Sequence, residues 1–205
     1  MRLLITGAGG FVGSHLVDYL RAEHPQVQLF GLERAHGAAP RDLPVGMAAL
    51  PADLDDRASV ESALEEAQPD AVVHLAGQSS VQSSWTDPGS TLRTNVMGVI
   101  HLLDGLRRRG RRARVLVVGS ADEYGPVSPA ELPLGEDRPL RPASPYAVSK
   151  AAQGLLALQY AGASGLSVIV TRTFPHTGPR RGEAFAESSF ARQIADAEAG
   201  NRPPA

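Results

Sequence analysis

Tyr146 and Lys150 are spaced so that they could act together in proton transfer. Four positions separate them, so on a helix the phenol and the ammonium lie on one face. A phenol normally has a pKa near ~10, and a neighbouring cation favours the phenolate, which would let the pair exchange a proton near neutral pH. Lys150 is the single lysine among the 20 lysine and arginine residues, and its compact ammonium can also reach ligand hydroxyls. The alternative is a surface helix that carries this spacing by chance.

A glycine-rich segment near the amino terminus has the features of a pyrophosphate-binding turn. It follows the apolar stretch Arg2–Thr6 and precedes an amphipathic stretch. Gly7 permits a tight turn, Gly10 lets backbone amides approach a pyrophosphate, and Gly13 lets a helix pack closely on the strand. The spacing is GxxGxxG, which departs from the GxGxxG fingerprint unless Gly9 is counted as the second glycine. Its place between strand and helix favours a dinucleotide site over a chance turn.

Polar residues at two further strand ends could contact the adenosine half of such a ligand. Glu33 follows the apolar stretch 27–32, at about twenty residues past the glycines, where an acid can hold the ribose hydroxyls. A solvated acid at a strand end is the alternative for Glu33. Arg34 could instead accept a 2′-phosphate, so NAD is favoured and NADP stays open. Asp53 follows a short third strand and could contact the adenine.

Ser120 and His74 also stand at the ends of apolar stretches. Ser120 follows the stretch 114–118, and carboxyl ends of parallel strands are where doubly wound sheets bind ligands. His74 ends a buried strand and is interpreted as a packed histidine rather than a catalyst. Asn95, on the following helix, is interpreted as structural.

These residues need a sheet to position them, and the chain alternates strand-like with helix-like stretches. The strands are predicted at residues 2–6, 27–32, 47–50, 70–77, 114–118 and 167–171, and the helices at 14–23, 57–67, 87–109, 146–163 and 183–199. Strict alternation predicts an α/β fold, a Rossmann-type doubly wound parallel sheet of six or seven strands with helices on both faces. One apolar stripe predicts which side of the helix at 87–109 is buried. It consists of Leu92, Val96, Ile100, Leu103 and Leu106.

Composition limits the classes of function. With 205 residues, 42% of them hydrophobic, the chain can bury the core of one domain, or of one domain and a fragment. A net charge of −2 gives no broad footprint for nucleic acid or an anionic membrane, and the arginine-rich run 107–112 is interpreted as a helix end. The absence of cysteine excludes disulfides and thiol catalysis. No signal-peptide pattern and no apolar run of ~20 residues occur, so we expect a cytoplasmic protein.

The glycine turn, the strand-end serine and the Tyr-x-x-x-Lys pair together resemble an extended short-chain dehydrogenase/reductase of the nucleotide-sugar epimerase/dehydratase group. Motifs of that family match at His74–Gln78, Tyr124–Gly125, Ser144–Tyr146 and Gly178–Pro179. Three segments are similar to GDP-4-keto-6-deoxy-mannose reductases, namely Leu75–Gln78, Phe174–Pro179 and Ala191–Ile194. The segment Arg180–Glu183 instead resembles GDP-mannose 4,6-dehydratases.

The resemblance implies an NAD or NADP cofactor, a GDP-linked sugar substrate and no metal. It assigns catalysis to Ser120, Tyr146, Lys150 and Asp122. It implies cofactor contacts from Gly7, Gly10, Phe11, Val12, Gly13, Glu33, Arg34, Asp53, Leu54, Leu75, Ala76, Gly77, Tyr146, Lys150 and Phe174. It implies substrate contacts from Gln78, Ser79, Ser120, Ala121, His176 and Arg181.

In the reaction that the resemblance implies, hydride passes between the nicotinamide and C4 of the sugar. Tyr146 moves the C4 hydroxyl proton, Ser120 hydrogen-bonds the same oxygen, and Lys150 lowers the pKa of Tyr146 and holds the nicotinamide ribose. Resembling dehydratases place a polar or acidic residue and then Glu after the serine. Ala121 and Asp122 occupy those positions here, which favours reduction of a 4-keto-6-deoxy sugar. Dehydration and epimerisation stay open, as does a one-residue loop shift that would put Glu123 in place of Asp122.

Two departures from the family pattern leave a further alternative. Pro175 stands where the family usually has asparagine, and family members are longer than this chain. We therefore expect an NAD(P)-binding domain at 1–178 and the truncated start of a substrate-binding region at 179–205. Such a chain could hold cofactor without turnover. The helices at 89–109 and after Tyr146 resemble the pair through which the family dimerises, so we expect a homodimer.

Overall fold

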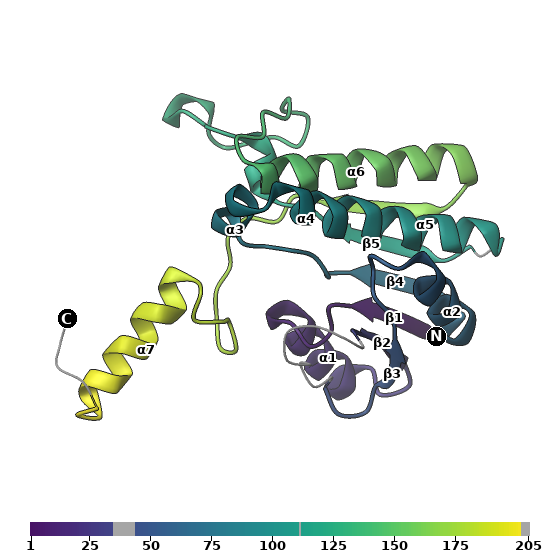
Figure 1. Cartoon of the computed structure of the whole chain (residues 1–205), viewed down its shortest axis with the longest axis horizontal. Coiled ribbons are helices and arrows are strands. Elements are labelled where there is room, and N and C mark those ends of the chain that lie inside the picture. The colour runs from purple at the N-terminus through teal and green to yellow at the C-terminus, as the bar shows by residue number, and fades with distance from the viewer. Residues whose placement is uncertain (35–43, 111, 202–205) are drawn as a thin grey trace. The chain divides into compact units, whose positions relative to one another are not determined.

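The computed structural model describes residues 1–34, 44–110 and 112–201, which fall into two compact units, Met1–Phe174 and Pro175–Ala205. The first unit is built on a parallel sheet in the order β3-β2-β1-β4-β5-β6 (Figure 1). The strands are β1 (Arg2–Thr6), β2 (Gln28–Glu33), β3 (Ala48–Pro51), β4 (Ala71–His74), β5 (Arg114–Val118) and β6 (Ser167–Thr171). The predicted Rossmann-type doubly wound sheet is therefore confirmed, with six strands in the described part of the chain. Its order reverses between β1 and β4, where such sheets bind ligands.

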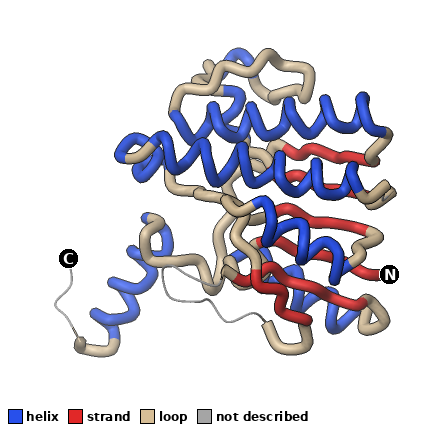
Figure 2. The backbone as a smooth tube through the Cα atoms, turned by 45° about the vertical axis from the view of Figure 1, so that its right-hand side comes forward, coloured by secondary structure: helices blue, strands red, loops and turns tan. Residues whose placement is uncertain are grey.

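Helices cover both faces of this sheet (Figure 2). In the first unit they are α1 (Phe11–Glu23), α2 (Arg57–Ala67), α3 (Val81–Thr86), α4 (Pro88–Leu92), α5 (Gly98–Arg108) and α6 (Pro145–Ser164). A π-helical turn (Arg93–Met97) joins α4 to α5, and two 3₁₀ turns follow β5, η2 (Ala121–Tyr124) and η3 (Pro129–Glu131). The second unit contains α7 (Ala186–Glu198).

Alternation along β1 divides the core in two. Leu3 and Ile5 pack with Val17 of α1 on one face, whereas Leu4 joins a larger cluster of α2, α5 and α6 side chains on the other. Successive side chains of a strand point to opposite faces, so a strand buried on both sides must be apolar throughout. This explains why Leu3, Leu4 and Ile5 of β1 form an unbroken apolar run.

The long helix predicted at 87–109 runs from Pro88 to Arg108 but contains a π turn. It is divided into α4, the π turn and α5, and the predicted buried stripe is only partly right. Leu103 and Leu106 are buried, but Leu92 is 39% exposed, while Asn95 is fully buried. A π turn adds one residue to the helical repeat and so changes which side chains face inward. The inward face at this point carries an amide instead of an aliphatic side chain.

Other differences are smaller. α3 and the two 3₁₀ turns were not predicted, and α7 begins later than residue 183 and buries none of its described side chains. Arg111, in the predicted arginine-rich helix end, lies outside the described residues. No helix of the described chain is long and apolar enough to cross a membrane. Among the described side chains there is no group of three or more that could hold a metal ion.

Candidate active site

Ser120 and Tyr146 meet at the carboxyl end of β5. Ser120 lies just beyond that strand, and Tyr146 lies in the first turn of α6. The sequence starts the helix here, because Ser144 accepts the N–H of Ala147 at 3.1 Å and Pro145 occupies the first helical position. The side chains of Ser120 and Tyr146 are hydrogen-bonded to each other. The two hydroxyls predicted to be catalytic thus share one site.

Lys150 lies one turn further along α6 and is only 8% exposed. Its Nζ donates to Oε1 of Gln153 at 3.3 Å, and the Gln153 amide donates to the carbonyl of Val118 at 3.2 Å. Burial lowers the pKa of Lys150 to about 8, and the negative charge of Glu123 opposes that shift. A fully buried glutamine thus links the ammonium to the end of β5.

Tyr146 is half-buried, and burial raises the pKa of its phenol. The hydrogen bond from Ser120 lowers the pKa of Tyr146, whereas the charges of Asp122 and Glu123 raise it. Burial is the largest of these influences, and Lys150 is not among them, so the lowering of the Tyr146 pKa by Lys150 stays a prediction.

The turn after Ser120 places two carboxylates differently. Asp122 is exposed, and its N–H donates to Oγ of Ser120 at 3.2 Å. Glu123 is 1% exposed, and its Oε1 accepts the N–H of Ser120 at 2.7 Å. The shift that would put Glu123 in the place of Asp122 does not occur. The neighbouring Ala121 is half-buried and donates its N–H to the carbonyl of Thr173 at 2.9 Å.

Asn95 ties the loop after β4 to α6. Its Oδ1 accepts the N–H of Gln78 at 2.8 Å, and its Nδ2 donates to the carbonyl of Gln78 at 3.0 Å and to Oγ of Ser149 at 2.8 Å. A Cβ on Gly77 would lie 2.8 Å from Oδ1 of Asn95. These contacts agree with the structural interpretation of Asn95. They fix the loop that carries Gln78 and Ser79, of which Ser79 is exposed.

The glycine turn between β1 and α1 packs against the end of β4. Gly7 has φ +75°, and a Cβ there would lie 2.8 Å from the amide nitrogen of Ala76. A Cβ on Gly13 would lie 2.3 Å from the carbonyl oxygen of Gly7. Both positions therefore require glycine, for the turn and for the close approach of α1, as the sequence predicted.

The first turn of α1 has no side-chain cap. Gly10 is its N-cap residue, and Phe11 and Val12 follow as its first two residues. Uncapped N–H groups at a helix start are suited to binding phosphate. Leu75 and Ala76, at the end of β4, are half-buried beside this turn. Turn and strand end thus lie together, and their role in binding a pyrophosphate stays a prediction.

His74 is packed, as predicted. It is 1% exposed, and its Nδ1 is hydrogen-bonded to Oγ1 of Thr6 at 2.8 Å. Burial, with a smaller contribution from the charge of Lys150, lowers the pKa of His74 to about 3. The imidazole is therefore neutral at physiological pH.

An ion pair joins the ends of β2 and β3. Nε of Arg34 lies 3.3 Å from Oδ2 of Asp53, with both side chains partly exposed. Leu54, the next residue, is 7% exposed. Glu33 ends β2 beside Pro51, and its side chain lies outside what the structure describes. Arg34 and Asp53, predicted independently as cofactor contacts, are thus brought together.

Comparison with known proteins identifies the chain. The family model for GDP-mannose 4,6 dehydratase matches residues 4–205. The chain belongs to this family. It is 39% identical over 194 residues to the GDP-6-deoxy-D-mannose reductase of Pseudomonas aeruginosa, covering 95% of this chain and 58% of the relative. It is 40% identical over 192 residues to a dTDP-glucose 4,6-dehydratase of Streptomyces antibioticus, covering 88% of this chain and 55% of the relative.

Solved structures of family relatives have the same fold. RMD from Pseudomonas aeruginosa complexed with NADPH matches with a TM-score of 0.83 and 39% identity, over 98% of this chain and 64% of the other. The UDP-glucose 4-epimerase of Thermus thermophilus complexed with NAD matches with a TM-score of 0.86 and 32% identity, over 98% of this chain and 63% of the other. This family chain therefore spans less than two thirds of the length of these relatives.

The family residues predicted to bind substrate are divided between the two units. Gln78, Ser79, Ser120 and Ala121 belong to the first unit, and His176 and Arg181 belong to the second. Arg181 donates to the carbonyl of His176, and its guanidinium lies 4.1 Å from the ring centroid of Phe185. Phe174, a predicted cofactor contact, is 56% exposed at the end of the first unit, next to Pro175. The roles of these residues in binding substrate or cofactor stay predictions.

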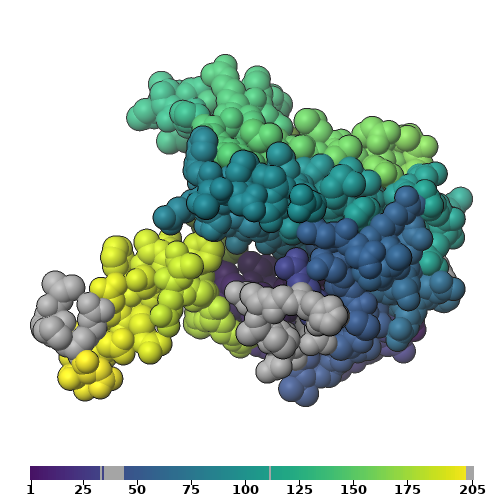
Figure 3. Space-filling model, viewed as in Figure 1, coloured from purple at the N-terminus to yellow at the C-terminus, as the bar shows by residue number. Residues whose placement is uncertain are grey.

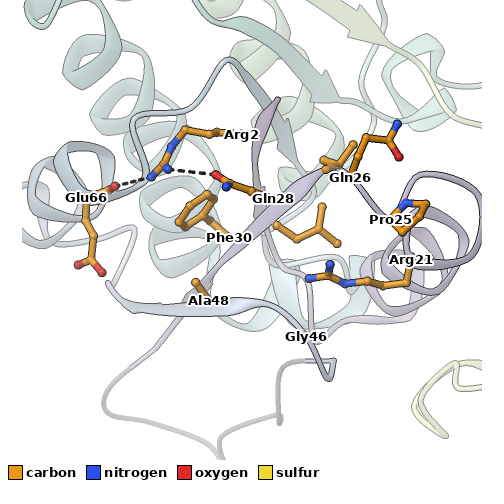
Figure 4. Close-up of a pocket in the computed structure, with 11 residues that line it drawn as sticks. Arg2, Arg21, Pro25, Gln26, Gln28, Phe30, Gly46, Ala48 and Glu66 are labelled. Carbon is orange, nitrogen blue, oxygen red and sulfur yellow. Dashed lines mark hydrogen bonds between the residues drawn. The ribbon is translucent and has the colours of Figure 1, made fainter.

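A cavity of about 550 Å³ lies at the other end of the sheet, where β1 and β2 begin (Figure 4). None of the predicted site residues lines it. Arg2 donates to the carbonyls of Ala67 and Glu66 and to the Gln28 side chain, and it lies over the Phe30 ring. Because that guanidinium is already bound by protein groups, we assign the cavity no ligand.

Sequence reasoning missed Gln153 and Arg172 near the site, and it missed the burial of Glu123. Glu123 and Gln153 are buried beside Ser120 and Lys150, and Arg172 lies directly after β6. Gln153 could have been found, since a polar residue three positions after Lys150 falls on the same helical side. Nothing local distinguishes Glu123 from the exposed Asp122, because its burial depends on a distant strand.

Proposed function

We propose that this chain is the cofactor-binding and catalytic part of an NAD(P)-dependent oxidoreductase that reduces the 4-keto group of a GDP-4-keto-6-deoxy-hexose. The observation that carries the proposal is the hydrogen-bonded Ser120–Tyr146 pair beside the buried Lys150. The 39% identity to a GDP-6-deoxy-D-mannose reductase supports the choice of substrate. Because the chain covers 58% of that relative, turnover is proposed for the longer protein that contains it.

The residues present fit a dinucleotide. Gly7 and Gly13 leave no room for a Cβ at the β1–α1 turn, and α1 begins without a side-chain cap, so backbone amides can hold the pyrophosphate. Arg34 and Asp53 would contact the adenosine half, and the guanidinium suits a 2′-phosphate. Relatives have been solved with NADPH and with NAD, so both stay candidates. When bound, the cofactor supplies the hydride.

The protein side of the reaction is proton donation. The Tyr146 phenol carries a proton at neutral pH, which suits a group that must give a proton to a carbonyl oxygen being reduced. The Ser120 side chain interacts with the Tyr146 phenol and would hydrogen-bond the same substrate oxygen. Lys150, which burial holds near the point of deprotonation, would take part through its charge and its hydrogen bonds to the cofactor ribose.

Dehydration is the second candidate reaction. It requires removal of the C5 proton and protonation of the leaving hydroxyl, so it needs further acid–base groups at the sugar. Asp122 is exposed beside Ser120 and is the carboxylate available for that role, whereas Ala121 has no titratable group and Glu123 is buried against the backbone. The family match and a dTDP-glucose 4,6-dehydratase relative favour keeping this alternative. Epimerisation ranks behind both.

Two experiments separate these possibilities. Titrating the 205-residue chain with NADH and NADPH tests cofactor binding, and binding without turnover would support a non-catalytic module. The full-length protein is then given GDP-mannose with NADP and, separately, the 4-keto-6-deoxy sugar with NADPH. Consumption of NADPH supports the reductase. Accumulation of the 4-keto sugar, with no NADPH consumed, would make it a dehydratase.

A homodimer is the proposed assembly. The helices α3 to α6, coloured teal to green, form one broad surface in Figure 3. These helices and the π turn between α4 and α5 carry exposed apolar side chains, which are Trp85, Leu92, Met97, Val148, Leu155 and Leu158. Apolar side chains gathered on neighbouring helices are typical of a subunit interface. We expect the mass of a dimer by light scattering at micromolar concentration, and we expect the protein in the cytoplasm.

A further inference from the structure

Glu123 is a buried carboxylate that contacts the active-site end of β5. Its Oε1 accepts the N–H of Ser120 at 2.7 Å, and Oγ of Ser120 accepts the N–H of Asp122, so the two residues close a reciprocal capping box around η2. A Cβ on Gly119 would lie 2.3 Å from Oε1 of Glu123. The carboxylate therefore fits tightly beneath the backbone that carries the serine.

Arg172 fixes the other side of this carboxylate. It follows β6, and its Nε lies 3.6 Å from Oε2 of Glu123, an ion pair rather than a hydrogen bond. The same guanidinium donates to Oη of Tyr124 at 3.3 Å and to the carbonyl of Glu136 at 2.5 Å. It also lies 5.2 Å from the ring centroid of Tyr124. The cation is thus held by several groups and cannot easily move away from Glu123.

We propose that Glu123 is a positioning residue, whose carboxylate holds the backbone of Ser120 so that the serine hydroxyl reaches Tyr146. Two kinds of influence on Tyr146 then come from one side chain. The contact with Ser120 supports the hydrogen bond that lowers the pKa of Tyr146, while the charge of Glu123 raises it. The proposed function is needed only to name the reaction that this arrangement serves.

A matched control exists a few residues further along the chain. Glu131 accepts the N–H of Ser128 at 2.8 Å, which is the same box contact, and pairs with Arg138 at 2.5 Å. Its side chain is 38% exposed, and no contact links it to Tyr146 among those that the structure describes. Substitutions at Glu131 therefore disturb an equivalent turn without reaching the proposed site.

The experiment titrates Tyr146 directly in the 205-residue chain. The four tyrosines are labelled with ¹³C at the ring carbon that bears the hydroxyl, and the Tyr146 signal is assigned by its loss in Tyr146→Phe. Glu123→Gln keeps an oxygen for the Ser120 N–H and loses the charge. Glu123→Asp keeps the charge but is one methylene shorter, so it cannot hold both Ser120 and Arg172. Thermal unfolding of each variant checks that it is folded.

We expect shifts of opposite sign. The pKa of Tyr146 falls in Glu123→Gln, because a repelling charge is gone, and rises in Glu123→Asp, because the hydrogen bond from Ser120 is weakened. The same changes at Glu131 leave the pKa of Tyr146 in place. An unchanged or lowered pKa in Glu123→Asp would overturn the proposal.

A second variant covers the case in which Glu123→Asp does not fold. Arg172→Lys keeps both charges but loses the guanidinium contacts that hold the carboxylate, so the pKa of Tyr146 should again rise; no rise would overturn the proposal. The titration needs neither cofactor nor sugar. A missing turnover would therefore leave this result untouched, and a failed titration would leave the proposed reaction untouched.

Discussion

Two turns of this chain use the same local device in different surroundings. In each, a glutamate accepts the N–H of the serine three residues before it, at 2.7 Å in η2 and 2.8 Å in η3, and an arginine faces the carboxylate. The glutamate of η2 is 1% exposed, whereas the glutamate side chain of η3 is 38% exposed. The residues are Ser120, Glu123 and Arg172 in the first turn and Ser128, Glu131 and Arg138 in the second.

The different surroundings shift the pKa values of the two glutamates in opposite directions. The hydrogen bond from Arg138, followed by the backbone bond from Ser128, lowers the pKa of Glu131 to about 2. Burial raises the pKa of Glu123, although Ser120 and Arg172 both act against that shift. A capping box alone therefore does not determine the pKa of the glutamate within it. Its burial decides whether it is a stable surface anion or a charge that acts on neighbouring groups.

Removing the buried glutamate should have the largest effect on stability. Glu123→Ala takes away the acceptor of the Ser120 N–H and leaves Arg172 facing an apolar gap, which should cost about 3 kcal/mol of the free energy of unfolding. Glu131→Ala should change it much less, because water can replace the exposed carboxylate. Urea denaturation at pH 7 compares the two. Equal losses would mean that burial does not distinguish the turns.

Substituting the residue that precedes each capping box should have the second-largest effect on stability. Gly119→Ala would place a Cβ 2.3 Å from Oε1 of Glu123 and 2.4 Å from the carbonyl of Thr171, so we expect a loss of about 2 kcal/mol. Val127, before the second box, already carries a branched side chain and is half-buried. Val127→Ala should therefore be milder in the same denaturation assay. If Gly119→Ala left the free energy of unfolding unchanged, the first turn could accommodate a Cβ, contrary to these distances.

The pH dependence of stability should carry opposite signs at the two acids. The depressed pKa of Glu131 contributes stability that is present above its unfolded value of 4.5 and is lost as pH falls toward 2, so Glu131→Gln should flatten that loss. The raised pKa of Glu123 contributes stability below 4.5 that is lost as pH rises through the folded pKa. Glu123→Gln should remove that decline. Urea midpoints between about pH 3 and 7 measure both, and slopes of one sign would refute the comparison.

Much of the fold follows from local pattern. Five of the six strands were placed within one residue, as at Arg2–Thr6 and Arg114–Val118, whereas the strand predicted at 70–77 ends at His74. The meeting of Ser120 with Tyr146 also followed, because the carboxyl end of a parallel strand faces the start of the next helix. The glycine requirements at Gly7 and Gly13 were predicted for the same reason. These features depend on neighbours in the chain.

The features that sequence reasoning missed depend on distant partners. The structural role of Asn95 was predicted but its burial was not, because its amide bonds to Gln78 and Ser149 and the π turn that turns it inward has no local signature. Glu123 is buried because β6 brings Arg172 beside it. The raising of the Tyr146 pKa by burial was also missed, since spacing on a helix says nothing about desolvation.

The most direct test of the account concerns Tyr146 as proton donor. Tyr146→Phe removes the phenolic proton and leaves the glycine turn and Arg34 untouched. In the full-length protein that contains this chain, we expect turnover of the 4-keto-6-deoxy sugar to fall by at least about 100-fold, while the dissociation constant for NADPH stays close to that of the unaltered protein. Glu131→Gln, in the exposed turn η3, serves as the control and should retain turnover. Retained turnover in Tyr146→Phe, or an equal loss of turnover and cofactor affinity, would contradict the assignment of Ser120, Tyr146 and Lys150 as the catalytic centre.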